Sequence, residues 1–259
     1  MPPDWPSSLF AESPWFAALR PTLDRLGWSR FPAAADWAAA SAGHCTVSAQ
    51  PLCFAPAPDD GLAYEERIWR TGRVATRPDN WHDAFNALAW LAFPRSKAAL
   101  NALHWRHLAH DPPGRRSRAR DAATLFDESG VAVVASDPTL LAALRDHQWA
   151  TLFQRRRADW GRQIEVWVLG HALSEKALAP FRGIVGKCAL LEVSPTHFGR
   201  PTVERLDWVD QALAARCDDD SLTQPGALPP LPLLGIPGWW PQQDADFYAD
   251  TGQFRPKRM

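Results

Sequence analysis

Lysine is scarce in this chain of 259 residues, which contains only Lys97, Lys176, Lys187 and Lys257, and the other 24 cationic side chains are arginines. The formal net charge is −1. That balance argues against a strongly basic protein that binds nucleic acid through its overall charge. Because alanine and proline are abundant as well, a GC-rich genome explains the excess of arginine more simply than phosphate recognition does.

Cysteine is also sparse, and its spacing matches no metal-binding motif. The four residues are Cys45, Cys53, Cys188 and Cys217. Residues 1–6 lack the basic start and the apolar run of a signal peptide, and no apolar stretch approaches membrane-spanning length. We therefore expect free thiols in a reducing cytoplasm and no membrane partner.

The composition, 46% hydrophobic and 22% charged, is that of a globular protein long enough to bury a core. We expect a single domain over 1–259, with a helical cover at 1–60, an α+β core at 61–216 and a proline-rich strap at 217–259. The 14 tryptophans are spread along the chain. This dispersal favours packing over the stacking of bases or sugars.

The hydrophobic pattern predicts an α+β fold, in which a small mixed sheet is surrounded by helices. Extended segments of the sheet are predicted near 64–76, 121–135, 163–170 and 186–193. The segment 51–61 is predicted as a loop, and residues 127–130, Asp-Glu-Ser-Gly, as a turn. The Asp-Pro-Pro-Gly sequence at 111–114 predicts a break in the chain.

Two helices joined by a Phe-Pro corner are predicted at the centre of the chain. The first begins after Asn80, whose side chain can cap it, with Asp83 at the third helical position. The second begins at Pro94, because proline is preorganised for the first helical turn and lacks an N–H that would have no partner there.

Polar residues repeat at helical spacing along both predicted helices. His82 and Asn86, four residues apart, share one stripe of the first helix. Lys97, Asn101 and His104 line one stripe of the second. Burying a lysine is costly unless it is paired, so this pattern indicates a site rather than a solvated surface.

These groups define a candidate catalytic site. His82 would act as general base or metal ligand, with Asp83 and Asp121 as its carboxylate partners. Lys97 would hold an anionic group of the substrate. The predicted substrate-binding residues are Asn86, Asn101, His104, Arg120 and His171. A structural interpretation stays open, in which Asp83 caps its helix, His82 bonds to backbone and Lys97 pairs with an acid.

A divalent metal is a further possibility. Asp121, Asp127 and Glu128, together with His82 or His171, offer ligand types common for such ions. Simple turn chemistry is the preferred interpretation of Asp127 and Glu128, and the sequence leaves the metal unidentified. His171 follows a predicted strand, where open α/β sheets place their ligands, and Glu175 would either orient it or only favour its helix.

Three segments carry a family resemblance. They read NWHDxFNALxWLxFPxxKxxLN over 80–101, RDxxTLFDESG over 120–130 and GHALxE over 170–175. The chain is similar here to an uncharacterised proteobacterial family, domain of unknown function 3025, and the resemblance covers most of its length. The resemblance implies a soluble bacterial protein and assigns no catalytic role.

The leading hypothesis is a cytoplasmic hydrolase that acts on a small anionic substrate through the His/Asp/Asn/Lys site. One alternative is a non-catalytic module that binds nucleic acid or a phosphorylated ligand through the arginines at 115–120 and 155–157. Another is an interaction scaffold, whose polar cluster only specifies packing. The oligomeric state is left open.

Overall fold

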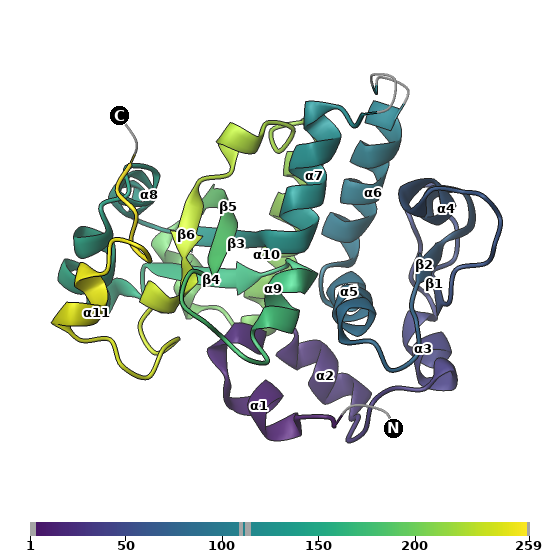
Figure 1. Cartoon of the computed structure of the whole chain (residues 1–259), viewed down its shortest axis with the longest axis horizontal. Coiled ribbons are helices and arrows are strands. Elements are labelled where there is room, and N and C mark those ends of the chain that lie inside the picture. Colours follow the sequence, from purple (N-terminus) through teal and green to yellow (C-terminus); the bar gives the residue numbers. More distant parts are fainter. Residues whose placement is uncertain (1–3, 109–110, 112–114, 258–259) are drawn as a thin grey trace.

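A four-stranded mixed sheet lies at the centre of the structure, a computed structural model that describes residues 4–108, 111 and 115–257 (Figure 1). The strand order is β4-β3-β5-β6, formed by Ile164–Val168, Gly130–Ala135, Val185–Glu192 and Pro230–Pro232. The strand β3 runs antiparallel to β4 and parallel to β5, and β6 runs antiparallel to β5. Every residue of β3 is buried, as expected of a central strand covered on both faces. The predicted α+β class, a single domain with a small mixed sheet surrounded by helices, is confirmed.

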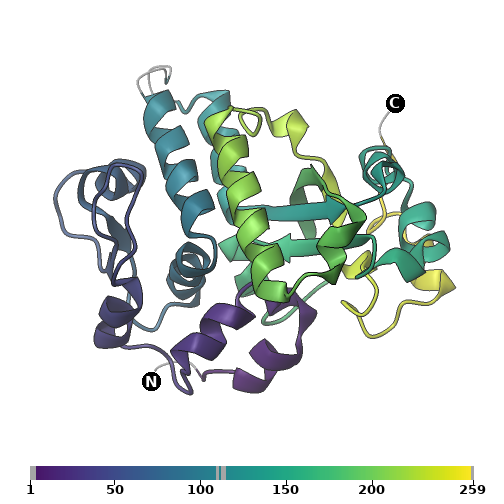
Figure 2. The ribbon, with the colours of Figure 1, turned by 180° about the vertical axis from the view of Figure 1, so that it is seen from behind.

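Helices make up most of the remaining structure. They are α1 (Ser7–Glu12), α2 (Arg20–Leu26), α3 (Ala34–Ser41), α4 (Tyr64–Thr71), α5 (Trp81–Ala92), α6 (Pro94–Leu108), α7 (Arg118–Ser129), α8 (Pro138–Arg145), α9 (His171–Lys176), α10 (Thr202–Asp218) and α11 (Ala245–Ala249). Figure 1 shows α5, α6 and α7 between the four-stranded sheet and the unit formed by α4, β1 and β2. From behind, α10 lies in front of the sheet and beside α6, with which it packs (Figure 2).

The predicted pair of helices at the Phe-Pro corner is confirmed. The side chain of Asn80 accepts a hydrogen bond from the N–H of Asp83, which caps α5. Phe93 leaves the helical conformation, as a residue before proline tends to do, and α6 starts at Pro94. The first N–H groups of α6 donate to the carboxylate of Asp210 on α10, and these hydrogen bonds hold α6 against α10.

An aromatic cluster from the N-terminal segment covers α5, whose residues 83–92 are all buried. The ring of Phe16 stacks on Phe85 with centroids 5.8 Å apart, and Trp5 stacks on Trp81 at 5.5 Å. At the other end of the chain, the predicted strap contributes β6 and α11. Across the described ranges, no helix combines the length and the apolar character that crossing a lipid bilayer requires.

The predicted extended chain at 64–76 is wrong for most of its length, because residues 64–71 form α4. Glu65 and Glu66 favour the first turn of this helix, and Glu66 pairs with Arg70 one turn later. Gly72 ends it with a φ of 68°. Only β2 (Arg73–Ala75) is extended, and it pairs in parallel with β1 (Cys53–Ala55), which lies inside the segment predicted as a loop.

The predicted strand and turn at 122–130 are also wrong, because residues 118–129 form α7. Ser117 caps this helix, and Ala122, Ala123 and Phe126 are buried at helical spacing. Asp127 and Glu128 therefore belong to the last helical turn. The predicted break at 111–114 falls largely on residues 112–114, which lie outside the described residues.

Candidate functional site

A cavity of about 510 Å³ opens among α4, α5, α7 and α9. It is lined mainly by charged and polar side chains. The predicted site residues in its wall are His82, Asp83, Asn86, His104, Arg120 and His171. The structure therefore brings together, from segments far apart in the chain, six of the nine site residues that the sequence predicts.

Two glycines create the close approach that builds this wall. The carbonyl oxygen of Gly130 accepts hydrogen bonds from the N–H groups of Leu169 and Gly170, at 3.1 and 2.8 Å. A Cβ atom on Gly170 would lie 2.6 Å from the nitrogen of Gly130, so no larger residue fits without displacing backbone. The end of α7 and the start of α9 consequently meet, which places Glu128 beside His171.

A pair of histidines forms the centre of the site. The Nε2 atoms of His82 and His171 lie 3.1 Å apart, and their rings are inclined by 75°. The other ring nitrogen of His82, Nδ1, lies 3.0 Å from a carboxylate oxygen of Glu175. Nε2 of His171 lies 3.6 Å from Glu128. The side chain of His82 is 37% exposed and that of His171 only 5%, so both rings line the cavity but the ring of His171 is held deeper in its wall.

A buried ion pair supports His171 from behind. The ammonium group of Lys97 is bonded to Asp127 and, at 2.8 Å, to Asn86 Oδ1. The second oxygen of Asp127 lies 3.8 Å from Nδ1 of His171. Burial is the largest single influence on Asp127 and opposes its ionisation, but the charge and hydrogen bond of Lys97 together with the attraction of His171 and His104 outweigh it and hold the pKa of this carboxyl below its usual value.

Burial also tunes the groups that face the cavity. It lowers the pKa of His171 to about 4, so the ring is neutral at neutral pH and keeps one nitrogen lone pair. Burial and the charge of Asp127 raise the pKa of Glu128, although the attraction of His82 opposes this shift. Such perturbed groups that converge on a cavity are characteristic of functional sites.

A small chamber of about 10 Å³ adjoins the cavity next to Asn101 and His104. The amide nitrogen of Asn101 donates to the backbone and side chain of Glu65, at 2.9 and 2.7 Å. Within the described part of the chain, Asn101 Oδ1, both ring nitrogens of His104 and Trp90 Nε1 are buried without a hydrogen-bond partner. The chamber has room for about one water molecule, which would satisfy such groups.

Three of the nine nominated residues lie outside the wall of the main cavity. Asp121 is exposed in the first turn of α7. Lys97 sits behind Asp127, with its side chain 3% exposed, and Asn101 faces the small chamber. Asp83, although it lines the cavity, is bound by the side chain of Arg77, at 2.8 and 2.9 Å, instead of contacting His82.

Several groups of this site are not among the residues that the sequence predicts for it. Asp127 and Glu128 were interpreted as turn residues, and the helical spacing of Ala122, Ala123 and Phe126 is the signal that would have assigned them to a helix end. Arg77 and Tyr64 carried no signal, because they reach the cavity only through the tertiary fold.

One group of side chains has the geometry to hold a metal ion. The ligand atoms of His82, Glu128 and His171 all lie within 4.8 Å of one another. Among the residues that the structure describes, no other set of three histidine, cysteine or acidic side chains meets this criterion. The arrangement can thus bind a cation or share a proton between its two rings.

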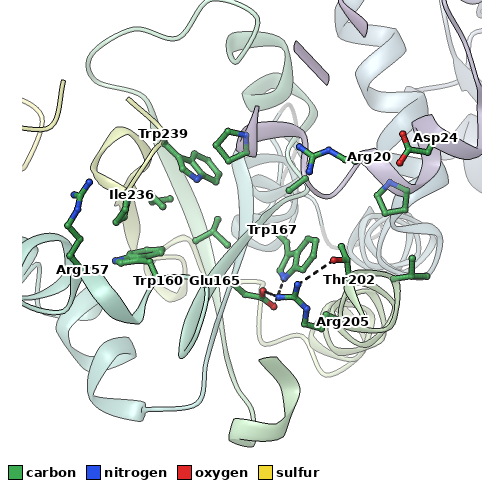
Figure 3. Close-up of a pocket in the computed structure, with 17 residues that line it drawn as sticks. Arg20, Asp24, Arg157, Trp160, Glu165, Trp167, Thr202, Arg205, Ile236 and Trp239 are labelled. Carbon is green, nitrogen blue, oxygen red and sulfur yellow. Dashed lines mark hydrogen bonds and ion pairs between the residues drawn. The ribbon is translucent and has the colours of Figure 1, made fainter. Parts of the chain in front are cut away.

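A second cavity, of about 720 Å³, lies beside the edge strand β4 and the start of α10 (Figure 3). Trp160, Trp167 and Trp239 supply its aromatic surface. Glu165 accepts hydrogen bonds from Trp167 and Arg205, as the dashed lines show, and the guanidinium of Arg205 neutralises its charge. None of the nominated residues lines this cavity, so the candidate site is the first one.

Comparison with known proteins adds a family but no activity. No curated protein and no solved structure matches this chain. The profile of one family, described as "Protein of unknown function (DUF3025)", matches residues 53–258, which include every residue of the histidine site. The chain therefore belongs to the DUF3025 family.

Proposed function

We propose that this protein is a hydrolase that acts on a small anionic substrate bound in the 510 Å³ cavity. The observation that carries the proposal is the His82–His171 pair, whose Nε2 atoms meet at 3.1 Å beside the cavity while Glu175 holds the far side of one ring. A histidine oriented by a carboxylate is a common device for activating water.

The reaction follows from this geometry. A water molecule at the histidine pair loses one proton to the site while its oxygen bonds to a carbonyl carbon or phosphorus atom of the substrate. The bond to the leaving group then breaks, and the leaving group takes up that proton. The pair can activate the water as a proton acceptor or as two ligands of a cation that carries it.

The anionic character of the substrate is inferred from the arginines of the wall. Arg77, Arg116 and Arg120 all line the cavity. Arg77 and Arg120 each pair with an aspartate, whereas the side chain of Arg116, among the residues that the structure describes, is bonded to the hydroxyl of Thr124 and forms no ion pair. Arg116 therefore offers a guanidinium that is not neutralised by an acid, which suits a carboxylate or phosphate group.

The roles first assigned to four residues change in this proposal. Lys97 positions Asp127 instead of clamping the substrate, because its charge is already paired. Glu128 and Glu175 replace Asp121 and Asp83 as the carboxylates that act on the histidines. Asn86 holds Lys97 and Tyr64, at 2.8 and 2.6 Å.

A panel of chromogenic anionic esters tests the proposal. We expect hydrolysis of a phosphate monoester or of a carboxylated acyl ester. His82→Asn should lower kcat/KM by roughly 10² to 10⁴, the usual contribution of such a group. The matched control is His147→Asn, a histidine that is bonded to the backbone oxygen of Arg255 and does not line the cavity. Equal activity of the two variants, or no hydrolysis of any ester by the unaltered protein, would refute the proposal.

A separate experiment tests the alternative, a non-catalytic module that binds nucleic acid. Retention on a polyanion column that disappears when Arg115, Arg116 and Arg118 are replaced would favour it.

We also propose a cytoplasmic location, to be checked by cell fractionation. In the described part of the chain, all four cysteines are free thiols, as a reducing compartment permits.

A further inference from the structure

We propose that His82, His171 and Glu128 bind one divalent transition-metal ion, of which Zn²⁺ is the best fit, through the two Nε2 atoms and a carboxylate oxygen. This inference deepens the proposed hydrolase by naming what activates the water. It stands on distances and hydrogen bonding that are independent of any activity.

The distances within the group match a shared ion. Two imidazole nitrogens bound to one tetrahedral zinc ion at about 2.0–2.1 Å lie roughly 3.3 Å apart. The separation between Nε2 of His82 and Nε2 of His171 is 3.1 Å, and that between Nε2 of His171 and the Glu128 carboxylate is 3.6 Å. These two values bracket the expected separation, and the ligand atoms of His82 and Glu128 lie within 4.8 Å of each other, so an adjustment of the side chains would bring all three onto one ion.

The hydrogen bonds around the rings favour a cation bound between them over two neutral rings in direct contact. A neutral His82 that donates from Nδ1 to Glu175, at 3.0 Å, has a bare Nε2. If Nε2 of a neutral His171 donated its proton to Nε2 of His82, Nδ1 of His171 would carry no proton. That nitrogen would then face the carboxylate of Asp127 at 3.8 Å, so two hydrogen-bond acceptors would oppose each other in a buried place. A metal ion between the Nε2 atoms lets each Nδ1 carry its proton toward a carboxylate.

The second layer of contacts has the form that metal sites use. Histidine ligands of metals usually direct their other ring nitrogen at a carboxylate or carbonyl group, which fixes the ring. Here Glu175 faces His82, and Asp127, itself held by Lys97, faces His171. Both rings thus present the same nitrogen to one point and the other nitrogen to an acid.

The charge around the rings also favours a cation. The three carboxylates of Asp127, Glu128 and Glu175 surround the pair, and Lys97 is the buried cation beside them. Lys176, whose charge also acts on Glu128, is exposed and therefore screened. Imidazole ligands select zinc and its neighbours over Mg²⁺ and Ca²⁺, which prefer oxygen. Two nitrogens and one carboxylate leave a coordination position for water.

Zinc titration of the untagged, chelator-treated full chain tests the site. We expect one ion bound per chain by elemental analysis and calorimetry, and a higher melting temperature with zinc, since a ligand of the folded state stabilises it. His82→Asn and Glu128→Gln should reduce the bound zinc to near zero, while His147→Asn keeps one ion. Glu175→Gln should weaken binding by about 10- to 100-fold, the usual effect of losing such a supporting contact.

The results separate this inference from the proposed hydrolase. Zinc bound at one per chain without any ester hydrolysis would leave the metal site standing and refute the hydrolase. Ester hydrolysis by a chain that binds no zinc would refute the metal site and leave the hydrolase standing. A wild-type chain that binds no zinc, or zinc retained by both ligand variants, overturns the inference. If a variant does not fold, the wild-type titration decides alone.

Discussion

Replacing Lys97 by methionine should destabilise the protein strongly, because it leaves a buried carboxylate without its partner. The side chain of Lys97 is 3% exposed and that of Asp127 13% exposed. Removing one member of such a buried pair costs about 3–5 kcal/mol. Methionine keeps most of the apolar stem, so the loss reports on charge. For a domain of this size, about 2–4 °C per kcal/mol corresponds to a fall of roughly 6–20 °C in melting temperature.

Urea denaturation of matched variants measures this effect. Lys257→Met removes an exposed pair with Asp146, in which the two side chains are 58% and 51% exposed, and should leave the midpoint of denaturation nearly unchanged. The double variant Lys97→Met with Asp127→Asn should recover stability relative to Lys97→Met alone, because no unpaired charge remains. A cost for Lys97→Met as small as that for Lys257→Met would refute the reasoning and leave Lys97 available to bind a substrate.

Two further substitutions test how the fold positions the site. Asp210→Ala should cost about 2–4 kcal/mol in urea denaturation, because it strips the partner from two backbone N–H groups at the start of α6; Asp207→Ala, an exposed neighbour, should cost less than about 1 kcal/mol. Gly130→Ala should abolish cooperative folding or lower the melting temperature by many degrees, since the new Cβ would lie 2.2 Å from the carbonyl oxygen of Phe126. Gly199→Ala, where nothing lies within 4 Å, is its control, and similar melting curves for the two glycine variants would contradict the steric argument.

The errors in the predicted elements have a common cause. The sequence predicts extended chain where α4 and α7 form, because each segment contains a short apolar or alternating run. Such a run does not distinguish a strand from one buried face of a helix. The cap at Ser117 and the burial of Ala122, Ala123 and Phe126 decide for the helix in α7. The capping of α5 and the proline start of α6 were predictable because both depend on neighbours in the sequence.

The residues of the candidate site also differ in whether near neighbours in the sequence predict them. His82 and Asn86 were found from helical spacing alone, because residues four apart on a helix share a face. The partners of His82 lie 89 and 93 positions away in the sequence, at His171 and Glu175, and no local pattern specifies them. Asp121 was chosen over Asp127 for its place beside a strand that the structure replaces with a helix.

By itself, the sequence determined the class of fold, the capped pair of helices and the polar stripes along them, because these follow from periodicity and from contacts between near neighbours. Only the tertiary structure decided which acids face the histidines and that Lys97 is neutralised by Asp127. The reason is physical: the approach of Gly130 to Gly170 closes the end of α7 onto the start of α9, and contacts across so long a stretch of chain arise from packing, which a linear pattern does not encode.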